Sequence, residues 1–124
     1  MIPKFRVWDN KSRTMHHPDE LIIQIRESDI LVALEYSLHQ VFDYVLMQST
    51  GLTDKNGVEI FDGDILNHQL QGMRKVYYPF RDTVASYGLE NIENGMRSTL
   101  QDAHRVYEVI GNIYENPELL EEER

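Results

Sequence analysis

Four acidic residues and three glycines fall within GLTDKNGVEIFDGDIL, residues 51–66. Carboxylates between glycine turns are suited to binding Ca²⁺ or to acting as a general acid and base, so an EF-hand loop is the first hypothesis. With Gly57 at the sixth position of such a loop, Asp54 occupies the third, which fits. Leu52 and Gly63 then occupy the first and twelfth positions, where carboxylates are required. The spacing therefore excludes an EF-hand.

Two other interpretations of this stretch stay open. Asp54, Asp62 and Asp64 would form a looser divalent-cation site, and a metal-dependent hydrolase using it is one functional hypothesis. Alternatively, the Asn-Gly step at 56–57 and the Asp-Gly step at 62–63 are tight turns, because Asn and Asp side chains accept nearby backbone N–H groups. We favour the turns and predict that the first is a type I′ hairpin turn, with positive φ at both central residues.

Other catalytic and ligand-binding motifs are absent from the sequence. The chain has no cysteine, and its five histidines include no pair at the i, i+4 spacing of a zinc-binding helix. It contains no nucleophile elbow, P-loop or dinucleotide-binding glycine pattern. We therefore assign no catalytic, cofactor-binding or metal-binding residue, and we expect a protein without enzymatic activity.

The net charge bears on the partners of the chain. Its 124 residues carry a formal charge of −9, whereas a nucleic-acid-binding domain usually presents a basic patch that releases counterions from phosphates. The best candidate interaction surface combines Arg74 and Lys75 with Tyr77 and Tyr78, because tyrosines stack on bases and also anchor protein interfaces. Nucleic-acid binding by a small barrel is thus the alternative hypothesis, disfavoured by charge, and protein binding is the leading one.

The sequence also indicates a compartment. The N-terminus, MIPKFRVWDN, has no apolar segment typical of a secretion signal, and no run approaches 18 apolar residues. Absence of cysteine suits a reducing environment. We expect a protein of the bacterial cytoplasm with no membrane partner.

The elements that must position these residues are mostly short strands. Alternating polar and apolar residues predict a strand at 4–8 that turns into a hairpin with 13–16, and the β-branched run at 21–25 predicts another strand. Residues 29–40 fit either a helix, with apolar residues at helical spacing, or a buried strand, and we lean towards the helix. Further strands are predicted at 41–48, 59–61, from 64 onwards, 73–78 and 105–110.

Short helices complete the expectation. One is predicted from Ser98 to His104, and one begins at Asn116, where Asn at the N-cap and Pro at the first helical position are typical of a helix start. The chain then forms one mainly β domain over residues 1–124, with two or three short helices. Within it we expect a hairpin region at about 1–45 and a β core at about 46–124 that includes a less regular insert at about 80–104.

Three stretches together resemble one protein family. They are KFRVWDNKSRTM (Lys4–Met15), LMQSTGLTDKNGVEIFDGDIL (Leu46–Leu66) and YEVIGNIYENPELLEEE (Tyr107–Glu123). In this order they resemble the YopX-like family of small proteins encoded by bacteriophages and prophages of Gram-positive bacteria. The residues that carry the resemblance, called the signature residues below, are Gly51, Leu52, Asp54, Asn56, Gly57, Gly63, Asp64, Ile110, Gly111, Asn112, Tyr114, Asn116 and Pro117.

The resemblance implies a β-rich protein with a small barrel-like core. It implies no enzymatic activity and supplies no catalytic or ligand residue, because the signature residues are turn and core formers. We therefore expect an accessory phage or prophage protein that binds an unknown host or phage protein or associates with itself.

Overall fold

The computed structural model describes residues 4–37, 39–78, 86–100 and 104–121. Strands account for 51% of the structure and helical turns for 9%, so the prediction of a mainly β chain is confirmed. The β structure includes a half-barrel sheet. The prediction of two or three short helices is wrong, because the helical segments are lone 3-10 turns. Across the described ranges, no helix has the length and apolar character that crossing a membrane needs.

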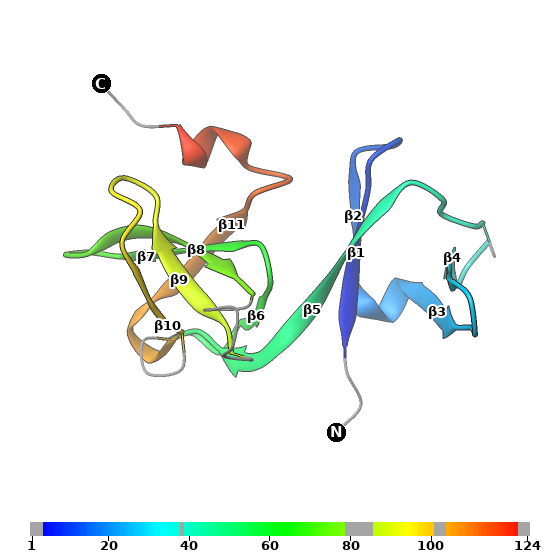
Figure 1. Ribbon diagram of the computed structural model, residues 1–124, viewed down its shortest axis with the longest axis horizontal. Coiled ribbons are helices and arrows are strands. Elements are labelled where there is room, and N and C mark those ends of the chain that lie inside the picture. Colours follow the sequence, from blue (N-terminus) through cyan, green and yellow to red (C-terminus); the bar gives the residue numbers. More distant parts are fainter. Residues whose placement is uncertain (1–3, 38, 79–85, 101–103, 122–124) are drawn as a thin grey trace. The chain divides into compact units, whose positions relative to one another are not determined.

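The chain folds as two compact units, Met1–Gln48 and Ser49–Arg124. Both units consist mainly of strands, which Figure 1 labels in their order along the chain. Strand β5 (Tyr44–Thr53) contributes to each unit in turn, because its residues up to Gln48 pair with β1 and those from Ser49 pair with β6.

The first unit begins with the predicted hairpin. Strand β1 (Phe5–Asp9) pairs with β2 (Thr14–His16) and, on its other side, with β5. The Asp9 carboxylate closes the turn by accepting the N–H groups of Lys11 and Ser12 over 2.9 and 3.2 Å. An Asp side chain that bonds backbone groups ahead of it is the expected chemistry of this turn.

Within residues 29–40, for which the sequence favours a helix, Ile30–Leu34 form a strand, so that prediction is wrong. Strand β4 (Ile30–Leu34) pairs along its full length with β3 (Leu21–Ile25), and the turn Arg26–Asp29 joins them. Val32, at the centre of β4, is fully buried. The apolar run has the length of a strand and a paired neighbour, and this tertiary pairing overrides the helical spacing. The core of the unit comprises Val7, Val32 and Val41, against which Leu21, Ile30, Leu34, Tyr44 and Leu46 pack.

The second unit is built on a five-stranded antiparallel sheet with the order β10-β9-β8-β7-β11. Strand β6 (Glu59–Phe61) precedes it and pairs with the end of β5. The five strands are β7 (Asp64–His68), β8 (Gly72–Tyr77), β9 (Gly88–Asn91), β10 (Arg97–Thr99) and β11 (Glu108–Asn112). Strands β9 and β10 lie within the predicted insert at about 80–104, of which residues 80–85 and 101–103 lie outside the described residues.

Both predicted helices of this unit are replaced by other structure. Residues 97–99 pair with β9, and the helical turn that follows, η2 (His104–Val106), is a short 3-10 turn. At the C-terminal end, η3 (Pro117–Leu120) is also a 3-10 turn, with i to i+3 bonds from Leu119 N–H to Asn116 O and from Glu121 N–H to Glu118 O. Four residues are too few to propagate an α-helix.

One face of this sheet supports the core of the unit. Leu66, Val76 and Leu89 come from β7, β8 and β9 and are almost fully buried, as are Ile60, Leu100 and Tyr107 from flanking segments. Because side chains alternate along a strand, Met73, Lys75 and Tyr77 of β8 lie on the opposite face. That opposite face carries the groove described below.

Candidate functional site

Asp54 of the predicted acidic cluster joins two distant stretches of the signature. One of its carboxylate oxygens accepts the N–H groups of Asn56 and Val58 over 2.8 and 2.9 Å, and the other accepts Val109 N–H over 2.8 Å. The backbone adds a bond from Lys55 N–H to Tyr107 O, over 3.0 Å. Asp54 therefore holds the β5–β6 turn against strand β11. A carboxylate suits this position because its two oxygens accept three backbone N–H groups.

The environment of Asp54 keeps its carboxylate ionised. Burial raises the pKa of the group, but the N–H groups of Val109, Val58 and Asn56, together with the nearby Lys55, outweigh burial and hold the pKa below its usual value of 3.8. A carboxylic acid with a lowered pKa is deprotonated at neutral pH and is badly matched to act as a general acid there. Asp54 behaves as a structural acceptor.

The turn at Asp54 differs from the predicted type I′ turn. Gly57 has φ +83°, but among the described residues other than glycine only Arg13 has positive φ, so Asn56 does not adopt it. Gly57 N–H donates to Asp54 O and Asp54 N–H donates to Val58 O. This pattern is a longer hairpin loop with one left-handed glycine at its end. The prediction of a hairpin turn is confirmed, and its type is corrected.

The second acidic turn contacts the C-terminal signature stretch. Gly63 N–H donates to Val76 O, and Gly63 O accepts Ile113 N–H, both over 3.0 Å. Asp64 is 1% exposed, and its Oδ2 accepts Phe61 N–H over 2.8 Å. In the ladder of β7 and β11, Asp64 lies opposite Asn112. Both acidic turns are thus structural elements that connect strands.

Asn112 and Asn116 shape the turn after β11. The Asn112 side chain accepts the N–H groups of Tyr114 and Glu115 over 3.0 and 2.8 Å, and Asn116 Oδ1 accepts Asn112 N–H over 3.2 Å. Asn116, expected to cap a helix, makes no side-chain capping bond to η3. Its side chain lies over Gly111, where a Cβ atom would approach Asn116 Oδ1 to 2.5 Å.

The remaining signature residues have structural positions too. Gly51 adopts φ +80° where the β5–β6 register shifts, and Leu52 packs against the core of the unit. Ile110 is the extra residue of a bulge in β11, and Pro117 opens η3.

The acidic residues that the structure describes do not gather into a metal site. Within the described ranges, no three His, Asp or Glu residues lie close enough together to hold a metal ion. Both oxygens of Asp54 and Oδ2 of Asp64 accept backbone N–H groups. Nothing in this arrangement supports the hydrolase hypothesis.

The candidate interaction residues Arg74, Lys75, Tyr77 and Tyr78 do not form one basic surface. Strand β8 has a neighbour on both sides, and its alternation places Arg74 on the core face, with its guanidinium 6.0 Å from the centre of the Tyr107 ring. Lys75 lies on the other face, 3.9 Å from the Glu90 carboxylate. Pro79 and Phe80, the continuation of this aromatic stretch, lie outside the described residues. Nucleic-acid binding at this strand stays a prediction that the geometry does not favour.

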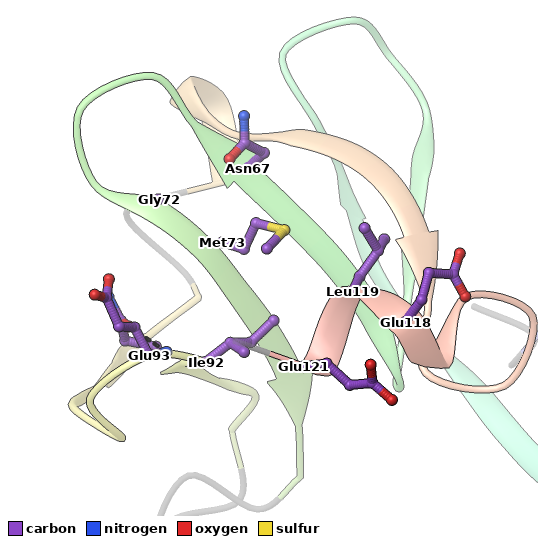
Figure 2. A pocket seen from close by; sticks show the side chains of 9 residues that line it. Asn67, Gly72, Met73, Ile92, Glu93, Glu118, Leu119 and Glu121 are labelled. Atoms are coloured by element: carbon purple, nitrogen blue, oxygen red, sulfur yellow. Dashed lines mark hydrogen bonds between the residues drawn. The ribbon is translucent and has the colours of Figure 1, made fainter. Parts of the chain in front are cut away.

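A groove that the sequence did not indicate lies on the outer face of the sheet of the second unit (Figure 2). Its volume is about 530 Å³, and it is open to solvent. Met73, Ile92 and Leu119 point towards one space from β8, the end of β9 and η3. The polar lining consists of Asn67, Asn91, Glu93, Glu118 and Glu121, with Gly72 completing the wall.

Strand pairing and the C-terminal helical turn η3 together form this groove. Met73 pairs with Asn67 in the β7–β8 ladder, and Ile92 N–H donates to Met73 O over 3.2 Å. Figure 2 shows η3 crossing beside these strands, which brings Leu119 over the groove. The C-terminal signature turn therefore has a second effect beyond stability, because it places one wall of the groove.

The groove is acidic at both ends. Glu118 and Glu121 lie on the η3 side and Glu93 lies on the opposite side (Figure 2). All three are exposed, and none of the described residues that line the groove is basic. An apolar floor between carboxylates is chemically suited to an apolar side chain that has cationic neighbours.

Comparison with known proteins places the chain among relatives of matching length. The family model described as YopX protein matches residues 4–121. The crystal structure of protein EF1440 from Enterococcus faecalis is similar at 32% identity with a TM-score of 0.62, covering 98% of this chain and 99% of that one. The crystal structure of protein yopX from Bacillus subtilis is similar at 25% identity with a TM-score of 0.64, covering 97% of each chain. Among curated proteins no relative matches.

Proposed function

The chain belongs to the YopX protein family, and from this premise we propose that it is a non-enzymatic accessory protein of phage or prophage origin that binds another protein. The binding site is the acidic-rimmed groove on the second unit, defined by Met73, Ile92 and Leu119 with Glu93, Glu118 and Glu121 around them. The resemblance of three stretches to phage-encoded proteins supports the origin, and the groove supports the binding.

The observation that carries the proposal is the separation of roles between signature and groove. The polar signature residues Asp54, Asp64 and Asn112 accept backbone N–H groups and so hold strands and turns in place. The groove instead presents side chains that are available to a ligand, since Met73, Ile92 and Leu119 are all partly exposed. This division of roles supports a protein-binding function for the groove.

Charge selects the class of partner. The groove has Glu93 at one side and Glu118 and Glu121 at the other, within a chain whose net charge is −9. A peptide segment with one apolar side chain between lysines or arginines would place the apolar group on the floor and its charges at the rim. We expect the partner to present such a basic segment.

Binding of a short fluorescent peptide, with one leucine flanked by lysines, tests this function. Fluorescence anisotropy should show saturable binding that weakens with salt, because rim charges are exposed and screened. Glu118→Lys should weaken affinity about fivefold to tenfold, since it replaces an attraction by a repulsion. Leu119→Ser should weaken it further by removing apolar contact.

A matched variant separates the groove from general charge effects. Glu35 is exposed and lies in the first unit, so Glu35→Lys changes net charge equally and should leave affinity within about twofold of wild type. Peptides with alanine in place of leucine, or glutamates in place of lysines, should bind weakly. Equal binding by all these peptides, or an equal loss in Glu35→Lys and Glu118→Lys, would disprove groove recognition.

A further inference from the structure

Within the described part of the first unit, strand β3 is paired along one edge only. Among the described residues, β4 is its only strand partner. Glu20 O and Arg26 N–H, at the two ends of β3, bond to Glu35 and Asp29 on the β4 side. Hydrogen-bonded positions alternate in an antiparallel pair, so the backbone groups of Ile23 and Ile25 point to the outer edge.

The free edge is apolar and exposed. Ile25 is 74% exposed and Ile22 is 38% exposed, and the strand from Leu21 to Ile25 contains no charged residue. Two-stranded ribbons are marginally stable in water, and an uncharged edge is a template for another strand. The edge therefore offers a partner strand both unpaired backbone groups and exposed isoleucines.

The charges at the ends of β3 identify that partner. Glu20 stands directly before the strand and Arg26 directly after it. If two copies of β3 pair antiparallel about Ile23, the Glu20 of each copy lies opposite the Arg26 of the other, and Leu21 lies opposite Ile25. In this register the residues that lie opposite each other, Leu21 and Ile25, are also those whose backbone groups point outwards. One register therefore satisfies the backbone bonds, pairs the end charges and covers Ile25.

We propose that the protein forms a two-fold symmetric dimer in which the outer edge of β3 pairs with β3 of a second copy. The pairing is isologous, because each copy contributes the same edge, one acidic end and one basic end. Because each copy carries both an acidic and a basic end, a second copy matches both ends of the strand at once. This interface lies in the first unit and goes beyond the groove, whose function does not depend on it.

Both end residues already have partners within the chain. Arg26 forms a bidentate ion pair with Asp29, with both N–O distances 2.6 Å. Glu20 accepts His17 N–H over 3.1 Å and lies 3.6 Å from His16 Nδ1. Arginine has five N–H donors, so Arg26 can bond Asp29 and a second carboxylate together. A charge reversal at either site also alters these local contacts, so the test must separate the two effects.

Mixing two charge-reversed variants separates the effect on the interface from the effect on contacts within each chain. Arg26→Glu alone places acidic residues opposite each other twice in a dimer, and Glu20→Arg alone does the same with basic residues. Each should weaken dimerisation at least about tenfold, measured by sedimentation velocity across a concentration series. An equimolar mixture restores opposite charges at both positions of a heterodimer, so dimerisation should return to near wild-type strength.

Local effects of the variants cannot produce that recovery, because mixing changes no contact within a chain. The doubly reversed variant Glu20→Arg/Arg26→Glu should also dimerise, and circular dichroism should show folded strands in each variant. A wild-type protein that is monomeric at millimolar concentration would overturn the proposal. So would a dimer that neither reversal weakens, or single variants that remain monomeric when mixed.

Discussion

Replacing Asp54 with alanine should lower the free energy of unfolding by about 3–4 kcal/mol, among the largest effects of any single change in this chain. Asp54 is 5% exposed, and its carboxylate accepts backbone N–H groups from Asn56, Val58 and Val109. Alanine leaves these donors without their acceptor, and it removes the side-chain bond that joins the β5–β6 turn to β11. Urea denaturation followed by circular dichroism measures the loss.

Asp54→Asn separates charge from shape. The amide retains one oxygen but presents an NH₂ group towards one of the donors, so we expect an intermediate loss of about 2 kcal/mol. Asp19 is exposed, and Asp19→Asn, the matched control, should change stability by less than about 0.5 kcal/mol. Equal stability of Asp54→Asn, Asp54→Ala and wild type would show that the carboxylate does not fasten these strands.

The effect of Asp54 should depend on pH in one direction. The folded protein holds the pKa of this carboxyl below 3.8, so ionised Asp54 stabilises the fold at pH values above the unfolded pKa. This contribution is lost as the pH falls through the lower, folded pKa. The stability difference between wild type and Asp54→Asn should therefore be constant near neutral pH and shrink below about pH 4. A difference that grows towards acid pH would contradict the lowered pKa.

Gly111→Ala should destabilise the protein by about 2–3 kcal/mol through overpacking. A Cβ atom at residue 111 would lie 2.5 Å from Asn116 Oδ1 and 2.8 Å from its Cγ. The Asn116 side chain must then move and release Asn112 N–H, which donates to it over 3.2 Å. Thermal denaturation of the variant measures the cost.

A double-mutant cycle tests this cause. In an Asn116→Gly background the obstructing side chain is gone, so Gly111→Ala should cost at least about 1 kcal/mol less than in wild type. An unchanged cost would mean that Gly111 is required for some reason other than the contact with Asn116.

The features predicted best from the sequence are those that depend on interactions between residues a few positions apart. The Asp9 turn, the hairpin near Gly57 and the strand containing Val76 follow from side-chain chemistry and alternation, and all are present. The resemblance to the YopX-like family was confirmed over residues 4–121. What the sequence did not reveal is that Asp54 reaches Val109, a contact across 55 positions.

The failures have physical causes. Ile30–Leu34 satisfies both helical and strand spacing, and only its pairing with β3 decides between them. Asn116 and Pro117 have the order of a helix start, but the Asn116 side chain bonds back to Asn112 and the helical turn ends after four residues. In both cases a tertiary partner that the local sequence does not show determines the conformation.

The groove could not be predicted for a related reason. Met73, Ile92 and Leu119 belong to three separate segments, and each is an ordinary apolar residue in its own context. Only the ladder of β7, β8 and β9, together with the η3 turn, brings them to one space (Figure 2). A lone isoleucine after Asn91, in an otherwise polar stretch, is the sole local hint.

The most direct test of the proposed binding function is an NMR titration of isotope-labelled protein with the lysine–leucine–lysine peptide. If the peptide binds in the groove, amide and methyl signals of Met73, Ile92 and Leu119 shift together along one saturable curve, while signals around Asp54 stay in place. Shifts scattered over the acidic surface without saturation, or confined to residues outside the groove, would contradict it.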